Sequence, residues 1–343
     1  MSSISKFTCH IAPRTLKEPF RTSLRSVSYF NVIEFHVETD DGLQAIGEAV
    51  ETPAITGDTQ EMILKGLLGS IKGALEGVSF SSPLELVERI ANTSAASSAK
   101  SAADMALYYL ESVIENKTFA EVLGSTRPTI ASDVTIPVTD LANIEQIVFA
   151  RLKDGFNSFK VKLAMEPTEN SIQKLELIHQ IAGHECVIRI DPNQSWSVTH
   201  SLNFLEEIDR RGISIDYLEQ PTPADDKRAL AEIKRNTQTR IMADESCFDM
   251  EDLLQLIEYE AADLINLKLL KSGGISPSLQ MAEVAREAGL GVLVGSMMEG
   301  DRGVFASACL ADALAPGEIH DLDASWWAKD SSINYRAGQV LLR

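Results

Sequence analysis

Charged residues recur at the ends of short apolar segments in the second half of this chain. The segments are SFKVKLA, VIRIDPN, IDYLEQP, RIMADES, LINLKLL and EIHDLDA, and the charges of the first five follow one another at intervals of 24 to 29 residues. Each interval can hold one strand, one helix and two short loops. This spacing is typical of a parallel (β/α) barrel, in which residues at the carboxyl ends of several strands share one site. We therefore predict that these charges meet in a single cavity.

The first part of the chain has a different pattern. Alternating apolar and polar residues at 4–11, 30–39 and 43–50 predict an antiparallel meander, with a hairpin at the DDG of 40–42 between its last two strands. Helical patterns follow near 58–76, 83–91 and 99–116. Strands followed by helices indicate an α+β domain. We predict an N-terminal α+β capping domain over 1–127, an α/β barrel of seven or eight strands over 128–324, and a C-terminal segment, 325–343, that returns to pack on the capping domain.

Composition excludes several classes of partner. The formal net charge of −19 over 343 residues argues against nucleic acid or an anionic membrane, because both need a clustered basic face. The sequence contains no apolar run of about 18 residues and no pattern of a signal peptide at its start. The four cysteines are scattered without a CxxC pair, so we expect neither a disulfide framework nor a zinc site. These features predict a cytoplasmic protein.

Two lysines share one face of the first charged segment. Residues two apart in a strand point the same way, so Lys160 and Lys162 point together, while Phe159, Val161 and Leu163 point to the other side. The apolar side must face the surrounding helices, which places both ammonium groups inside the barrel. A lysine pair on a solvated edge strand is the alternative for an isolated KxK. Here the acidic residues on the following strands favour the interior, because they would compensate the buried charge.

Three carboxylates close three successive strands. Asp191, Glu219 and Asp244 would repel one another inside a barrel unless a cation held them. Oxygen ligands without histidine or cysteine favour Mg²⁺, with Mn²⁺ as a second possibility, over zinc. Each acid could instead cap the helix that follows it, which explains one residue more easily than three.

Lys268 lies one unit beyond Asp244, on the same face of its strand as Leu264 and Asn266. We expect it to enter the cavity opposite Lys162. Neighbouring cations and partial burial are expected to lower its pKa toward about 7–8, which suits a general base. Two bases facing each other across one group suggest a 1,1-proton transfer, in which one lysine removes a proton from carbon and the other returns one to the opposite face.

Two further acids and an arginine suggest how a substrate is held. Asp321 and Asp323 lie two apart at the end of the last strand, where they would suit a cationic group such as an amine; a polar loop capped by aspartates is the alternative. Arg25 lies between the first strands, where a lid loop could be, and Arg21 is a rival for any role in that loop.

These motifs resemble the enolase superfamily, and within it the muconate-lactonizing-enzyme subgroup. The resemblance rests on KxK, the three strand-end acids and the following lysine, together with ITGD at 55–58, MADES at 242–246, NLKLLKSGG at 266–274 and GSMME at 295–299. The DLD at 321–323 is similar to the DxD of dipeptide epimerases. The resemblance implies an enolase-type barrel, a homo-oligomer and a Mg²⁺-dependent dipeptide epimerase that inverts the α-carbon of the C-terminal residue through a metal-stabilised enediolate. L-Ala-D/L-Glu, from the turnover of cell-wall peptides, is the first expected substrate.

The resemblance also implies roles for individual residues. It makes Lys162 and Lys268 the acid/base pair, places Lys160 beside the substrate carboxylate, and makes the three strand-end acids the Mg²⁺ ligands. It assigns Asp321 and Asp323 to the α-ammonium group and Arg25 to the glutamate side chain. The remaining expected dipeptide contacts are Thr135, Ser296 and Met298. The sequences Gly300-Asp301-Arg302 and Gly124-Ser125-Thr126 depart from the subgroup pattern. The first of them leaves the identity of the second amino acid open.

Other functions fit part of these observations. An N-succinylamino acid racemase, an o-succinylbenzoate synthase or an epimerase of another dipeptide class would use the same lysines. A catalytically silent protein that binds metal and peptide is the alternative from a different class. The presence of two paired bases argues against the silent protein, because binding alone requires none.

Overall fold

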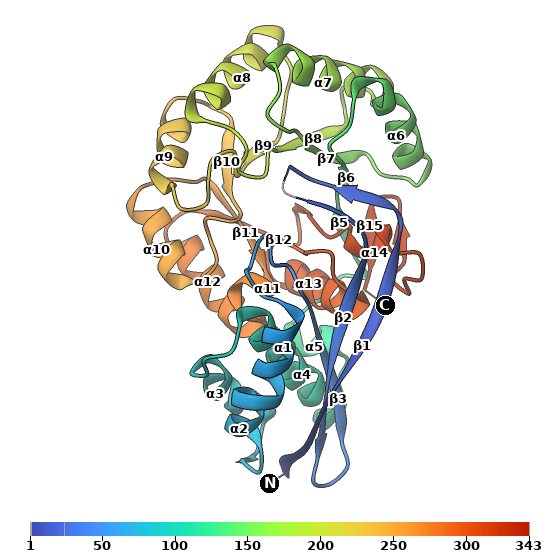
Figure 1. Cartoon of the computed structure of the whole chain (residues 1–343), viewed down its shortest axis with the longest axis vertical. Coiled ribbons are helices and arrows are strands. Elements are labelled where there is room, and N and C mark those ends of the chain that lie inside the picture. The colour runs from blue at the N-terminus through green and yellow to red at the C-terminus, as the bar shows by residue number, and fades with distance from the viewer. Residues whose placement is uncertain (1, 24, 343) are drawn as a thin grey trace.

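The computed structural model describes residues 2–23 and 25–342, which form an N-terminal capping domain and a barrel (Figure 1). The capping domain has a four-stranded antiparallel sheet in the order β3-β2-β1-β4. Its strands are β1 (Ser2–Arg21), β2 (Ser26–Thr39), β3 (Gln44–Val50) and β4 (Ser79–Phe80). Its helices are α1 (Gln60–Gly66), η1 (Leu67–Ile71), α2 (Lys72–Leu75), η2 (Pro83–Leu86), α3 (Val87–Ala91), α4 (Ser97–Ile114) and α5 (Phe119–Leu123). The predicted hairpin at 40–42 is confirmed, with Gly42 in the turn at φ +90°.

The ribbon formed by β1 and β2 is longer than the sequence pattern predicts. It runs from the capping domain to the barrel (Figure 1), and near its far end Phe20 pairs with Val27. The alternation predicted a strand only over 4–11, because beyond that point the ribbon leaves the core of its own domain. Its apolar residues Leu16 and Phe20 are buried against the barrel and the C-terminal segment instead. The ribbon therefore brings part of the capping domain to the barrel.

The barrel contains a seven-stranded parallel sheet in the order β12-β11-β10-β9-β8-β7-β6. Its strands are β6 (Val134–Ile136), β7 (Ser158–Lys162), β8 (Val187–Asp191), β9 (Tyr217–Glu219), β10 (Arg240–Ala243), β11 (Leu264–Lys268) and β12 (Gly291–Gly295). The helices are α6 (Leu141–Lys153), α7 (Thr168–Ala182), α8 (Val198–Arg211), α9 (Lys227–Arg235), α10 (Met250–Glu258), α11 (Leu269–Ser272), α12 (Ile275–Glu287) and α13 (Asp301–Leu314). The fold class predicted from the spacing is confirmed.

An eighth segment occupies the gap between β12 and β6. β13 (Ile319–His320) pairs in parallel with β5 (Thr129–Ser132), which directly precedes β6. On its other side, the Ser296 N–H donates to the Asp321 carbonyl at 2.8 Å. The strand-end residues of β13 therefore join those of the seven-stranded sheet around one cavity.

The C-terminal segment contacts both domains. It contains α14 (Ala324–Trp327), β14 (Tyr335–Arg336) and β15 (Gln339–Leu341). β15 pairs with β5 of the barrel, whereas the Trp327 ring lies edge-on against Phe20 of β1 at 5.1 Å. Within the described residues, no helix combines the length and apolarity needed to cross a bilayer. The four cysteines are unpaired, and three of them are buried.

Candidate active site

A cavity of about 50 Å³ lies between the β1–β2 ribbon and the carboxyl ends of the barrel strands. Its lining includes nine residues that the sequence predicted for the site, namely Arg25, Thr135, Lys162, Asp244, Lys268, Ser296, Met298, Asp321 and Asp323. It also includes Phe20, Thr22, Ile55, Asn193 and Met297. Residues more than 290 positions apart in the chain therefore line one cavity that both domains form.

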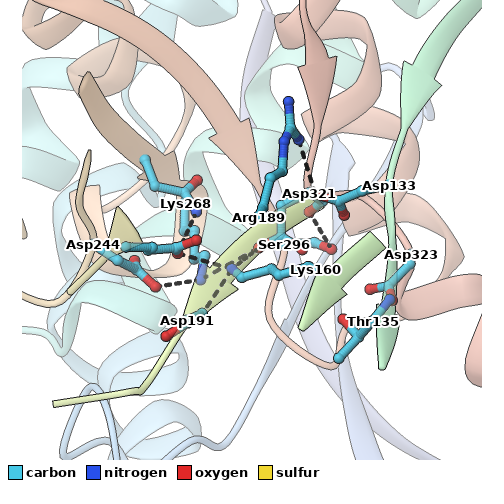
Figure 2. Close-up of polar contacts among 12 residues, drawn as sticks. Asp133, Thr135, Lys160, Arg189, Asp191, Asp244, Lys268, Ser296, Asp321 and Asp323 are labelled. Carbon is cyan, nitrogen blue, oxygen red and sulfur yellow. Dashed lines mark hydrogen bonds and ion pairs between the residues drawn. The ribbon is translucent and has the colours of Figure 1, made fainter. Parts of the chain in front are cut away.

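Lys160 lies at the centre of the charged cluster, with only 1% of its surface exposed. Its Nζ is 2.8 Å from Glu219 Oε1, 2.8 Å from Asp321 Oδ2 and 3.2 Å from Asp191 Oδ2. Figure 2 shows it beside Asp191 and Asp321, where dashed lines mark these contacts. Burial acts to lower the pKa of Lys160, but the three carboxylates outweigh it and hold the pKa well above its usual value. Lys160 is therefore a fixed positive charge.

The two candidate bases each pair with a different acid. Lys162 Nζ is 2.5 Å from Asp191 Oδ2, and Lys268 Nζ is 2.6 Å from Asp244 Oδ2. Burial acts to lower the pKa of Lys268, but contact with Asp244 outweighs it, and the pKa is raised. The predicted decrease is therefore wrong for this ion-paired arrangement. Periodicity showed which way the lysine points but not which carboxylate its ammonium group would contact.

The three strand-end acids offer oxygen atoms of the kind that bind a divalent cation, although among the described residues no three acidic, histidine or cysteine side chains are already arranged to hold one. Asp191, Glu219 and Asp244 are buried at the ends of β8, β9 and β10. Burial, together with the charges of the other two acids, raises the pKa of Glu219 to about 8 despite Lys160. In the described part of the chain, the buried Glu219 Oε2 has no hydrogen-bond partner. A cation bound by these oxygens would satisfy that atom and relieve the repulsion, and oxygen ligands are those Mg²⁺ prefers.

Several residues that sequence reasoning missed hold these acids in place. Lys271 Nζ lies 2.6 Å from Asp244 Oδ1, and the Asn193 main-chain N–H donates to Asp191 Oδ1 at 2.8 Å. Asn266 Nδ2 donates to Glu219 Oε1 at 3.1 Å. Asn266 lies two residues before Lys268 in β11, so the alternation of the strand indicated that its side chain also points into the barrel. Lys271 lies beyond the strand, in α11, where this alternation no longer predicts the direction of a side chain.

Asp321 and Asp323 differ in what surrounds them. Asp321 Oδ2 contacts Lys160 and lies 3.8 Å from Lys268 Nζ. Asp323 Oδ2 accepts hydrogen bonds from the Thr135 N–H at 2.7 Å and from Trp327 Nε1 at 2.8 Å. In Figure 2 Thr135 and Asp323 lie together, away from Lys268 and Asp244. Both acids line the cavity, so a cationic group there would meet two carboxylates.

Arg25 lies at the lid side of the cavity, at the start of the β2 half of the ribbon. Among residues 2–23 and 25–342, none forms an ion pair or a hydrogen bond with its guanidinium group. Burial lowers its pKa, the direction expected for a cation without a nearby acid. Arg21, the alternative, is exposed and does not line the cavity.

Asp301, within the Gly300-Asp301-Arg302 sequence that departs from the subgroup pattern, has a structural role in this chain. Asp301, the first residue of α13, accepts hydrogen bonds from the Ser325 and Ser331 hydroxyls and from the Ser332 N–H and hydroxyl. It thereby ties the C-terminal segment to α13. The neighbouring Ser296 and Met298 line the cavity.

Fold and site together define an enolase-type protein, with a capping domain over a barrel whose strand ends carry lysines and acids. Residues 5–124 match the mandelate racemase / muconate lactonizing enzyme N-terminal domain family, and residues 144–340 match the enolase C-terminal domain-like family. The chain belongs to this mandelate racemase / muconate lactonizing enzyme group of the enolase superfamily. This confirms the resemblance seen in the strand-end motifs.

Relatives of this chain include dipeptide epimerases. The L-Ala-D/L-Glu epimerase of Clostridium acetobutylicum is 32% identical over 90% of this chain and 86% of its own length. The substrate-liganded L-Ala-D/L-Glu epimerase from Bacillus subtilis superposes with a TM-score of 0.94 at 29% identity, covering 99% of this chain and 96% of that one. The dipeptide epimerase from Enterococcus faecalis V583, complexed with Mg and L-Leu-L-Tyr, gives 0.91 at 27% identity, covering 99% and 97%.

Proposed function

We propose that this protein is a Mg²⁺-dependent dipeptide epimerase that inverts the α-carbon of the C-terminal residue. The observation that carries the proposal is the placement of Lys162 and Lys268 on one cavity. They end β7 and β11, between which three strands of the sheet intervene. In a barrel of eight positions, strands four apart lie on opposite sides, so the two amines approach a bound carbon from opposite faces.

The surrounding charges support this chemistry. A substrate carboxylate would lie beside Lys160, and Asp191, Glu219 and Asp244 would hold Mg²⁺, which when bound polarises the carboxylate and acidifies the neighbouring C–H bond. One lysine, in its neutral form, removes the proton, and the other delivers a proton to the opposite face. General acid/base catalysis of this kind contributes ~10²–10⁴-fold. Because each lysine is paired with a carboxylate, removing a proton requires that the lysine first lose its own.

The ends of the cavity favour a dipeptide with an acidic second residue. Asp321 and Asp323 would receive the α-ammonium group, and Arg25 would receive a side-chain carboxylate. Arg25 supports L-Ala-D/L-Glu as the substrate because it is a half-buried cation that no described acid neutralises. Such a peptide would come from cell-wall turnover. Thr135, Ser296 and Met298 would contact its backbone and first side chain.

Binding requires the lid to move. Small-molecule sites usually have volumes of about 300–1,000 Å³, far larger than the cavity of about 50 Å³. The β1–β2 ribbon, with Phe20 and Arg25, and the segment around Ile55 form its lid side. We propose that these segments open to admit the peptide and close to exclude water during proton transfer.

Loss of the α-proton signal in D₂O, followed by proton NMR, tests the function. The substrates are L-Ala-L-Glu, L-Ala-D-Glu, L-Ala-L-Leu and N-succinyl amino acids, each with Mg²⁺ and with EDTA. Exchange confined to the two Ala-Glu peptides and abolished by EDTA is the expected result. Exchange of N-succinyl amino acids alone would replace the proposal with a racemase, and exchange of no substrate would refute it.

We also propose a cytoplasmic homo-oligomer. The four unpaired cysteines support a reducing compartment, and the resemblance to the subgroup supports self-association. Sedimentation equilibrium of the full chain would give the oligomeric state, and a monomer at micromolar concentration would contradict this part of the proposal.

A further inference from the structure

The carboxylate of Asp323 is held through one of its two oxygens. Oδ2 accepts both the Thr135 N–H and the Trp327 indole N–H, at 2.7 and 2.8 Å. Burial and the nearby Asp321 raise the pKa of Asp323, and the hydrogen bonds from Thr135 and Trp327 oppose this shift. Two donors on one oxygen fix the plane of the carboxylate, and hydrogen bonds to the charged form favour ionisation. Among the described residues, no group donates a hydrogen bond to the second oxygen, Oδ1, so this oxygen is available to a cationic group in the cavity.

The Trp327 ring cannot easily turn away from Asp323. It is fully buried and lies edge-on against Trp326 at 5.3 Å and against Phe20 at 5.1 Å. The Arg151 guanidinium group lies 4.8 Å from the Trp327 ring centre and 4.3 Å from that of Trp326. Arg151 is in turn paired with Glu18 of the ribbon at 2.6 Å. Packing on several sides, from the barrel, the ribbon and the C-terminal segment, therefore fixes the indole N–H.

We propose that Trp327 is a positioning residue that orients the Asp323 carboxylate toward the α-ammonium group of the substrate. The inference rests on the proposed function and extends it to a residue that does not line the cavity. It requires that Trp327 act only through Asp323. Its contribution should therefore depend on whether the substrate carries an ammonium group.

The test compares Ala-Glu with N-propanoyl-glutamate, which has the same shape but lacks the ammonium group. Trp327→Phe keeps an aromatic ring and removes the N–H donor. A hydrogen bond to a charged group accounts for a change of about tenfold to hundredfold. We expect kcat/KM for Ala-Glu to fall by about that factor, mainly through KM, with less than about threefold change for N-propanoyl-glutamate. If N-propanoyl-glutamate turns over too slowly, its inhibition constant against Ala-Glu gives the same comparison.

Two further variants separate positioning from packing. Trp326→Phe changes the adjacent ring, which contacts the same arginine but makes no hydrogen bond to Asp323 among the described residues. We expect it to affect both compounds equally. Trp327→His restores a ring N–H and should recover part of the preference for the ammonium group. Equal losses on both compounds for Trp327→Phe, or no loss on Ala-Glu, would overturn the inference.

A measurement on the unmodified protein covers the case in which Trp327→Phe does not fold. The chain has three tryptophans, so the indole N–H signal of Trp327 can be assigned in a ¹⁵N–¹H spectrum with Trp326→Phe and Trp196→Phe as references. Ala-Glu should shift this signal, and N-propanoyl-glutamate should not. Equal shifts would overturn the inference. If the unmodified protein exchanges the α-proton of Ala-Glu but these comparisons fail, only the role of Trp327 is lost; without exchange, the proposed function itself fails.

Discussion

Lys271 Nζ lies 2.6 Å from Asp244 Oδ1 and also donates to the main-chain oxygens of Asp244 and Asn266. Asp244 is therefore held by two lysines, of which Lys268 lines the cavity and Lys271 does not. Lys271 is 1% exposed at its side chain. Lys271 therefore lies behind Asp244, away from the cavity, where it can orient this candidate metal ligand but cannot contact the substrate.

Replacing Lys271 should weaken metal binding. Loss of a group that orients a metal ligand typically costs 10–100-fold in metal affinity, and we expect Lys271→Met to raise the Kd for Mg²⁺ within this range. Isothermal titration with Mg²⁺ measures the change. Lys234→Met is the matched control, because Lys234 also donates to a main-chain oxygen, that of Ala262, but lies outside the site. An unchanged Kd in Lys271→Met would contradict this role.

Removing one base should separate epimerisation from proton exchange. Lys268→Met should lower kcat for epimerisation by at least ~10²–10⁴-fold, because no group remains to act on one face of the α-carbon. Exchange of the α-proton in D₂O should persist for the single stereoisomer whose proton faces Lys162. Lys162→Met should retain exchange of the opposite stereoisomer. If each variant exchanged both stereoisomers, two facing bases would not be the explanation.

The role of Arg25 can be tested against an arginine on the same ribbon. Arg25→Met should lower kcat/KM for Ala-Glu by about tenfold to hundredfold, as expected for a lost hydrogen-bonded charge pair, and should leave a peptide with a neutral second residue much less affected. Arg21→Met should change neither, because Arg21 is exposed and does not line the cavity. Competition between Ala-Glu and Ala-Leu in one NMR tube gives the ratio directly. If the ratio of Ala-Glu to Ala-Leu turnover were unchanged in Arg25→Met, a residue other than Arg25 would bind the glutamate side chain.

Two buried carboxyls, one of which bonds across the contact between the domains, should make stability depend on pH. Glu48 of β3 accepts the Gly303 N–H at 2.7 Å, and burial raises the pKa of Glu48 from 4.5 to about 7. Burial and the nearby charge of Glu48 raise the pKa of Glu299 to about 8. Because the folded state holds these protons more tightly than the unfolded state, their stabilising effect is full below about pH 4.5. It is lost as the pH rises through about 7–8.

Glu48→Gln should therefore become more stable relative to the original protein as the pH rises. The difference in thermal midpoint should be small near pH 5 and largest near pH 8, reflecting about 1.4 kcal/mol for each unit of raised pKa. Glu61→Gln, at an exposed position, should show a constant difference. A constant difference for Glu48→Gln as well would show that Glu48 keeps the same pKa in the folded and unfolded states.

The sequence anticipated much of the site because strand geometry is local. Alternation along SFKVKLA placed Lys160 and Lys162 on the face opposite Phe159, and the regular spacing indicated that successive strand ends would share one cavity. The ribbon was harder to foresee, because the far half of β1 is buried by another domain rather than by its own. The sequence predicted that the segment 325–343 returns to the capping domain, but no pattern in it indicated a hydrogen bond from the Trp327 indole to Asp323.

What the sequence determined by itself is the direction in which side chains point and the order in which strands follow, since both depend on neighbours a few residues away. Only the tertiary structure decided which charges touch. Lys160 and Asp321 are separated by 161 positions yet lie 2.8 Å apart, and Lys268 gains a raised pKa from the carboxylate it contacts. Electrostatic interaction depends on distances of a few ångströms and on exclusion of water, and folding alone sets both.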